Sequence, residues 1–222
     1  MPETSGPFGI LGGTFDPVHR AHLNLARAAR KQLCLDNVLW IPTGQPPHRQ
    51  LPQTPAAHRL AMVRLAIAAE PGFELDAAEA MTDEPSFTVP TLERLRGIHG
   101  AARPLVLLVG ADAFLGLPSW HRWRDIFRLA HVAVASRPGA DLNEANMAAD
   151  LADMFRRCRG NRTALAAAPA GAIVGFEIEP VEPPDLSATM IRARLRGAAA
   201  LPADLLPPAV LDYIRLNHLY SA

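Results

Sequence analysis

Residues 12–22 read Gly12-Gly13-Thr14-Phe15-Asp16-Pro17-Val18-His19-Arg20-Ala21-His22, directly after the short apolar run Phe8–Leu11. A strand, a glycine turn and a helix start together form a phosphate cradle. Glycine lets the backbone approach an anion, and the N–H groups of a helix N-terminus point at it. His19 and His22 are three residues apart at the helix start and share one face. The stretch therefore predicts a site where bonds to a nucleotide phosphate are broken.

Apolar runs alternate with helical patterns along the rest of the chain. The runs that predict strands are Phe8–Leu11, Val38–Pro42, Phe73–Asp76, Leu105–Val109, Val132–Ser136 and Ile173–Glu177. The patterns that predict helices are Leu23–Leu33, Ala56–Ala69, Thr91–Arg96, Trp123–Leu129, Ala145–Arg157, Thr189–Arg196 and Ala209–Leu216. The alanine-rich stretch Ala164–Gly171 is expected to be a loop. This alternation predicts an α/β fold on a doubly wound parallel sheet, with helices on both faces and ligands beyond the carboxyl ends of the strands.

Length and composition fit a single domain. With 222 residues, 49% of them hydrophobic, the chain 1–222 can bury one α/β core, with 187–222 as a helical closing segment. Lys plus Arg and Asp plus Glu both number 22, so no charge excess indicates a nucleic-acid partner. No apolar stretch reaches the roughly 20 residues of a membrane span, and the N-terminus does not resemble a signal peptide. Cys34 and Cys158 lack metal-ligand spacing and are expected to be buried free thiols, which suits a reducing cytoplasm.

The histidine pair indicates a phosphate site rather than a metal site. One histidine alone would more often cap a helix, but a pair behind a glycine turn favours hydrogen-bond donation to phosphoryl oxygens. No cysteine or third ligand stands at metal spacing near His19 and His22, which argues against zinc. Asp16 and Pro17 set the turn, and ordering water or Mg²⁺ is an alternative role for Asp16.

Two further stretches predict contacts to a nucleotide. Gly110-Ala111-Asp112 follows the central strand, where glycine permits close approach and the carboxylate can accept hydrogen bonds from ribose hydroxyls. An N-cap role for Asp112 is an equally good and compatible alternative. Leu186–Arg192 begins a helix whose hydroxyl side chains, N–H groups and guanidinium make a second anion site.

Three stretches predict contacts to a second small molecule. Trp120 can stack on a heteroaromatic ring, whereas Trp123 is expected in the core. Pro85–Thr88 precedes a helix and either offers N–H and hydroxyl groups to a small carboxylate or simply caps that helix. His48 and Arg49 lie in a proline-rich loop and either reach a substrate phosphate or stay solvated.

Taken in order, these stretches resemble the bacterial nicotinate mononucleotide adenylyltransferases. The first loop resembles the His-x-Gly-His signature of the nucleotidyltransferase superfamily, and Ser187–Arg192 resembles its Ile-Ser-Ser-Thr-x-x-Arg partner. The other similar segments are Pro46–Arg49, Pro85–Thr88, Gly110–Asp112, Leu117–Trp120 and Ser136–Gly139. The match runs from Gly9 to about Tyr220, with Ala21 in place of the signature's glycine and Ala188 in place of a serine.

The resemblance implies transfer of AMP from ATP to nicotinate mononucleotide, giving nicotinate adenine dinucleotide and pyrophosphate in NAD biosynthesis. It implies that the catalytic residues are His19, His22 and Arg192. The implied ATP-binding residues are Gly12, Gly13, Thr14, Phe15, Gly110, Asp112, Ser136, Arg137, Ser187 and Thr189. The implied nicotinate mononucleotide-binding residues are His48, Arg49, Phe87, Thr88, Trp120 and His121. Mg²⁺ is expected to arrive with ATP, without a dedicated protein metal site.

Two alternative functions stay open at this stage. One is a different adenylyltransferase or cytidylyltransferase of the same superfamily, such as one acting on phosphopantetheine. The other is a catalytically inactive nucleotide-binding regulator. The expected partners are the two small substrates, with no nucleic acid and no membrane, and a homo-oligomer is possible.

Overall fold

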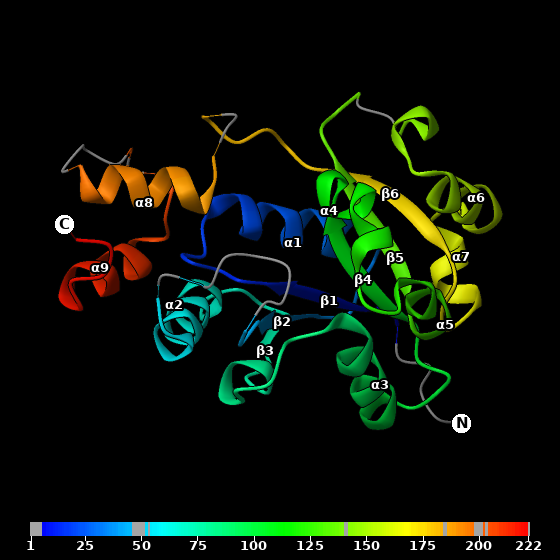
Figure 1. Ribbon diagram of the computed structural model, residues 1–222, viewed down its shortest axis with the longest axis horizontal. Helices are drawn as coiled ribbons and strands as arrows, with labels where there is room; N and C mark the ends of the chain where they lie inside the picture. The colour runs from blue at the N-terminus through cyan, green and yellow to red at the C-terminus, as the bar shows by residue number, and fades with distance from the viewer. Residues whose placement is uncertain are drawn as a thin grey trace. The chain divides into compact units, whose positions relative to one another are not determined.

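The computed structural model describes residues 6–45, 52, 54–139, 142–183, 186–197, 202 and 204–221. Within them, six strands form one sheet in the order β3-β2-β1-β4-β5-β6 (Figure 1). The strands are β1 Phe8–Gly13, β2 Val38–Pro42, β3 Phe73–Leu75, β4 Leu105–Gly110, β5 His131–Ser136 and β6 Ile173–Glu177. The order runs outward from β1 in both directions. Since parallel crossovers are right-handed, such winding places helices on both faces, as predicted for a doubly wound α/β fold.

Nine α-helices accompany the sheet in the described parts of the chain. They are α1 Arg20–Gln32, α2 Ala56–Ile67, α3 Thr88–His99, α4 Ala111–Leu115, α5 Ile126–Leu129, α6 Ala149–Cys158, α7 Arg162–Ala167, α8 Ala188–Arg196 and α9 Pro208–Leu216. Four short 3-10 helices are η1 Glu79–Met81, η2 Leu117–Ser119, η3 Trp123–Asp125 and η4 Glu144–Asn146. None of the helices in the described part of the chain is long and apolar enough to cross a membrane.

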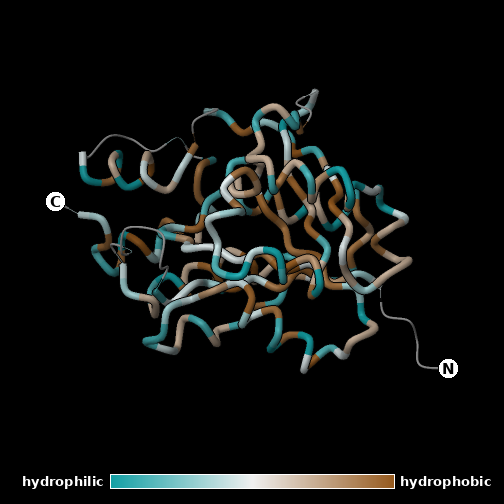
Figure 2. Tube along the Cα trace, turned by 45° about the vertical axis from the view of Figure 1, so that its right-hand side comes forward, coloured by the Kyte–Doolittle hydropathy of each residue, from teal (hydrophilic) through white to brown (hydrophobic). Residues whose placement is uncertain are grey.

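The central strands carry the apolar core. β4 pairs in parallel with β1 and with β5, and β5 pairs in parallel with β6. Leu105–Val109 is buried along its whole length, as expected of a strand covered on both faces. Figure 2 shows these hydrophobic strand segments in brown. The core rests on them, and the carboxyl ends of the same strands carry the polar turns described below.

Several sequence expectations were wrong in detail. α4 was not predicted, because five residues are too few to show a helical period. The expected loop Ala164–Gly171 begins inside α7, which Asn161 caps by accepting a hydrogen bond from the backbone N–H of Thr163. α3 begins at Thr88, three residues before its expected start. The expected helix Ala145–Arg157 is η4 followed by α6, and the expected helix Trp123–Leu129 is η3 followed by α5.

The two cysteines were expected to be buried, and this was wrong. Both are free thiols, but Cys34 is exposed and Cys158 is only partly buried. Cys34 follows the end of α1 with a positive φ of 53°, and Cys158 is the last residue of α6. Both therefore stand at helix ends, where the amphipathic pattern no longer forces a side chain inward.

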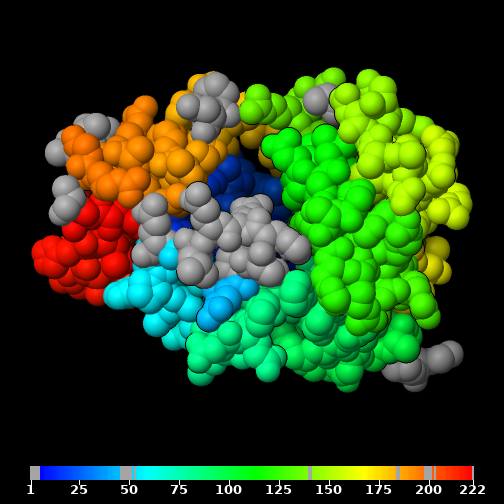
Figure 3. Space-filling view, viewed as in Figure 1, coloured from blue at the N-terminus to red at the C-terminus, as the bar shows by residue number. Residues whose placement is uncertain are grey.

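The described residues fall into two compact units. Unit 1 comprises those within Met1–Leu11, Ala26–Leu39 and Phe87–Glu179. Unit 2 comprises those within Gly12–Leu25, Trp40–Ser86 and Pro180–Ala222. In unit 2, the C-terminal helix α9, red in Figure 3, packs against α2, in cyan. The single domain over 1–222, with a closing segment at 187–222, stays a prediction.

Candidate active site

The turn that follows β1 belongs to unit 2 and is shaped by Phe15, while Gly12 and Gly13, expected in the turn, are the last two residues of β1. Phe15 has a positive φ of 50° and is 2% exposed. Its ring contacts those of Trp40, at 5.4 Å between centroids, and His22, at 5.0 Å. A Cβ atom at position 13 would lie 2.9 Å from the Phe15 ring, so Gly13 is required there. The Phe15 ring is thus used for packing, and the turn offers its backbone to a ligand.

The two histidines predicted to act together do lie together. Their rings stack with 3.8 Å between centroids and an interplanar angle of 27°. The backbone N–H of His19 donates to Nδ1 of His22 at 3.2 Å. This bond makes Nδ1 an acceptor, which places the proton of a neutral His22 ring on Nε2. His22 is therefore oriented as a hydrogen-bond donor through Nε2.

His19 differs from its neighbour because it is buried. The residue is 6% exposed, and burial lowers its pKa from 6.5 to about 4. Its Nδ1 atom is also buried and has no hydrogen-bond partner among the described residues. His19 is therefore uncharged at neutral pH, and two stacked positive rings are avoided.

This burial predicts a pH dependence of stability. The unfolded chain binds a proton on His19 near pH 6.5, whereas the folded chain binds it only near pH 4. The free energy of unfolding should therefore fall as the pH falls through this window, by up to about 1.4 kcal/mol per pH unit for this one group. Urea unfolding at several pH values should show a shallower slope for His19→Gln than for the unaltered chain. Equal slopes would contradict the prediction.

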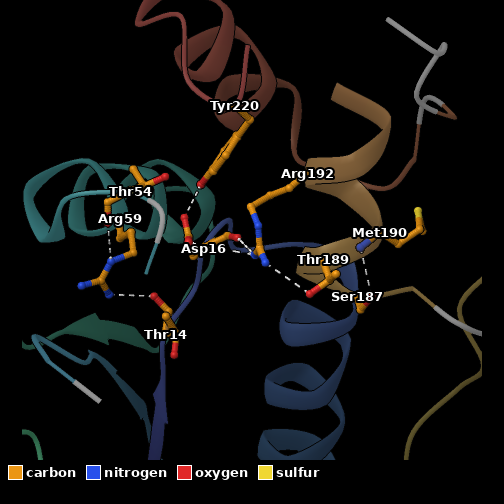
Figure 4. A network of polar contacts seen from close by, with 9 residues as sticks. All are labelled: Thr14, Asp16, Thr54, Arg59, Ser187, Thr189, Met190, Arg192 and Tyr220. Carbon is orange, nitrogen blue, oxygen red and sulfur yellow. Dashed lines mark hydrogen bonds and ion pairs between the residues drawn. The ribbon is translucent and has the colours of Figure 1, made fainter. Parts of the chain in front are cut away.

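The second anion-binding stretch begins α8 and also belongs to unit 2. The Ser187 hydroxyl accepts a hydrogen bond from the backbone N–H of Met190 at 3.2 Å and so caps the helix. Arg192 donates from Nη1 to the Asp16 carbonyl oxygen at 2.6 Å and from Nη2 to the Thr189 hydroxyl at 3.2 Å (Figure 4). The turn after β1 and Arg192 were predicted to bind the phosphates together, and they are in direct contact.

Asp16 stabilises the turn through its side chain, which is one of the two roles predicted for it. It is 4% exposed, and its Oδ1 atom accepts a hydrogen bond from the Tyr220 hydroxyl at 2.6 Å. Its Oδ2 atom lies 4.0 Å from Nη1 of Arg192. A carboxylate engaged in this way is a poor candidate for a metal ligand.

Sequence reasoning missed two residues of this network, Arg59 and Tyr220. Arg59, in α2, is 1% exposed and donates to the carbonyl oxygens of Thr14, Thr43, Gly44 and Thr54. A signal for it existed, because a charge at position 59 interrupts the apolar stripe that continues at 62, 63 and 66. Tyr220 gave no such signal, since its partner lies 204 residues earlier.

The proline-rich loop is described only at its edges. His48 and Arg49 lie outside the described residues. Gly44 and Gln45, just before them, line a pocket of about 390 Å³. Thr54, Arg59 and Thr82 are also among its lining residues.

Unit 1 holds four of the six residues predicted to bind the second substrate, namely Phe87, Thr88, Trp120 and His121. Phe87 precedes α3, and its ring lies 4.8 Å from that of His121. Trp120 is partly buried and Trp123 is 6% exposed, which confirms Trp123 as the core residue of the pair. Thr88 is the first residue of α3. Of this set, the structure brings Phe87 and His121 into contact, where the start of α3 meets the segment between η2 and η3.

Four more predicted residues lie at the carboxyl ends of β4 and β5 in unit 1. Gly110 pairs with Ala135, the residue before Ser136. Asp112 is exposed in the first turn of α4, whose N-cap is Gly110, so the N-cap role for Asp112 was wrong. Arg137 is exposed directly after β5. An aspartate and an arginine at these strand ends can reach the hydroxyls and phosphates of a nucleotide.

The described residues contain no group of three or more His, Cys, Asp or Glu side chains able to hold a metal ion.

Comparison with known proteins agrees with this chemistry. Residues 10–194 match the cytidylyltransferase-like family. The chain is 51% identical to a "Probable nicotinate-nucleotide adenylyltransferase" of Dechloromonas aromatica, covering 97% of this chain and 98% of that protein. A protein of the same name from Laribacter hongkongensis is 44% identical, covering 96% and 94%. A Plasmodium falciparum nicotinic acid mononucleotide adenylyltransferase complexed with NaAD shares the fold, with a TM-score of 0.72, 16% identity and 97% of each chain covered.

Proposed function

Because this chain belongs to the nicotinate-nucleotide adenylyltransferase family, it transfers AMP from ATP to nicotinate mononucleotide, and we propose which residues carry each part of that transfer. The products are nicotinate adenine dinucleotide and pyrophosphate. The observation that carries the assignment of roles is the contact between Arg192 and the turn that presents the stacked histidines.

The residues that we propose to bind the phosphates of ATP lie in unit 2. His22 donates from Nε2 to an oxygen of the α-phosphate, and the buried, neutral His19 supports it from the stacked position. Arg192 and the N–H groups at the start of α8 hold the β- and γ-phosphates, while residues 12–15 contact ATP through their backbone. Gly110, Asp112, Ser136 and Arg137 contact the rest of the nucleotide.

The nucleophile is a phosphate oxygen of nicotinate mononucleotide. The second pKa of a phosphate monoester is about 6, so this group is largely dianionic at neutral pH and no strong general base is needed. In-line attack forms an oxygen–phosphorus bond at the α-phosphate and breaks the bond to pyrophosphate, which leaves with its electron pair. Catalysis then consists of positioning and charge stabilisation. Mg²⁺ carried by ATP would supply further charge neutralisation.

Recognition of the nicotinate ring of the acceptor belongs to unit 1. Trp120 stacks on the pyridine ring, and the backbone N–H groups near Thr88 and His121 donate to the nicotinate carboxylate. His48 and Arg49 hold the acceptor phosphate. We place this metabolic step in the cytoplasm, and a homo-oligomer remains compatible with it.

These N–H donors predict a preference for nicotinate mononucleotide over nicotinamide mononucleotide. A carboxylate can accept from two N–H groups, whereas the NH₂ of an amide would point donors at donors. We expect kcat/KM for nicotinate mononucleotide to exceed that for nicotinamide mononucleotide by at least about tenfold. Initial rates with both substrates at fixed ATP measure this ratio, and equal values would contradict the assignment of the carboxylate site.

One assay tests the function as a whole. The chain is mixed with ATP, nicotinate mononucleotide and Mg²⁺, and pyrophosphate release is measured beside a parallel reaction containing phosphopantetheine. Release with nicotinate mononucleotide alone supports the proposal. Release only with phosphopantetheine would indicate another member of the superfamily, and ATP binding without turnover would indicate a regulator. Removal of Mg²⁺ by EDTA should abolish release.

A further inference from the structure

Tyr220 reaches back from the C-terminal part of unit 2 to the phosphate-binding turn. Its hydroxyl donates to Oδ1 of Asp16 at 2.6 Å (Figure 4). Tyr220 is 9% exposed and Asp16 is 4% exposed, so both polar groups are withdrawn from water. A buried carboxylate is costly unless its oxygens are partnered. The bond to Tyr220 therefore holds the Asp16 side chain in one orientation.

Asp16 in turn sets the position of Arg192. The Asp16 carbonyl oxygen accepts from Nη1 of Arg192 at 2.6 Å, and its Oδ2 atom lies 4.0 Å from the same nitrogen. Nη2 donates to Thr189, and Nε is buried without a hydrogen-bond partner among the described residues. The orientation of the guanidinium thus depends on Asp16 and Thr189.

The Tyr220 hydroxyl keeps its proton in this setting. Burial and the hydrogen bond to Asp16 raise the pKa of Tyr220, which outweighs the opposing effects of Thr54 and Arg192. At neutral pH the hydroxyl is therefore protonated and can donate to Asp16.

We propose that Tyr220 is a positioning residue for AMP transfer, whose hydroxyl fixes Asp16 and, through Asp16, both the phosphate-binding turn and Arg192. This inference rests on the proposed function, in which Arg192 holds the β- and γ-phosphates of ATP. Without the hydroxyl, Asp16 Oδ1 loses its donor and the guanidinium loses its fixed neighbour. Since a misplacement of about 1 Å can cost ~10²-fold in rate, the ATP side of the reaction should suffer while nicotinate mononucleotide binding does not.

The test compares the chain's two tyrosines, Tyr220 and Tyr213. Tyr213 also lies in the C-terminal part of unit 2, and its hydroxyl lies 2.9 Å from Nδ1 of His58. Tyr220→Phe should lower kcat/KM for ATP by about 10–50-fold through both kcat and KM, with an unchanged KM for nicotinate mononucleotide. Tyr213→Phe loses a comparable hydrogen bond and should stay within about twofold of the unaltered chain.

A double mutant shows whether Tyr220 acts through Asp16. In an Asp16→Ala background, Tyr220→Phe should change kcat/KM by less than about twofold, because residues that act as one unit are not additive. Equal losses in the two tyrosine variants, or full additivity with Asp16→Ala, would overturn the inference.

A binding measurement separates this inference from the function itself. Calorimetry with ATP alone should show about tenfold weaker binding for Tyr220→Phe than for Tyr213→Phe. If the unaltered chain fails to release pyrophosphate, the proposed function is refuted, whereas equal ATP affinities of the two variants would refute the role of Tyr220.

Discussion

His22→Ala should lower kcat by about 10²–10³-fold, as loss of one donor from an oxyanion site does. The turn orients His22 for this role, since the His19 N–H occupies Nδ1 at 3.2 Å and leaves Nε2 to donate. Such a donor is most valuable where negative charge grows on the α-phosphate as the bond to pyrophosphate breaks. The loss should therefore fall on kcat, while the KM values change little. Steady-state rates with both substrates varied give the two constants separately.

His22→Gln is the matched control. The side-chain amide of glutamine places a neutral N–H near the position of Nε2, so this variant should recover part of the rate that alanine loses. If both variants are equally slow, the amide of glutamine does not replace the donor that the His22 ring supplies, and the role of a neutral Nε2–H donor is not supported. A change in KM alone would show that His22 binds the ground state and the transition state equally well.

The sequence was sufficient for the parts of the site that are local in the chain. The β1 turn, the histidine pair and the start of α8 each combine glycine, hydroxyl or charged residues within a few positions. Trp123 could be assigned to the core because Trp120 directly follows the Pro118-Ser119 loop, whereas Trp123 begins the next helical pattern. Short-range chemistry of this kind is visible without coordinates.

What the sequence could not supply is the network that joins these parts. Asp16 meets Tyr220 and Arg192 across separations of 204 and 176 residues. No periodicity encodes such contacts, because they depend on how α8 and the C-terminal segment pack within unit 2. The partners of Arg59 are backbone carbonyl oxygens, which leave no trace in side-chain patterns.

Arg59→Met should lower the free energy of unfolding by at least about 3 kcal/mol, because several buried carbonyl oxygens lose their donor at once. Nη1 donates to Thr14 at 2.8 Å and to Thr43 at 2.6 Å, while Nη2 donates to Gly44 at 3.0 Å and Nε to Thr54 at 3.1 Å. Methionine fills a similar length but donates nothing. Urea unfolding followed by circular dichroism measures the change.

Arg64→Met is the control for Arg59→Met, because Arg64 lies on the same helix but is exposed. Its loss should change the free energy of unfolding by no more than about 0.5 kcal/mol. The loss in free energy of unfolding for Arg59→Lys should lie between those of Arg59→Met and Arg64→Met. A single ammonium group cannot reproduce the planar guanidinium that donates to four carbonyl oxygens. If Arg59→Met and Arg64→Met unfold alike, the buried guanidinium does not stabilise unit 2. If instead they differ as expected, the buried guanidinium of Arg59, which joins the carbonyl oxygen of Thr14 to α2, stabilises unit 2.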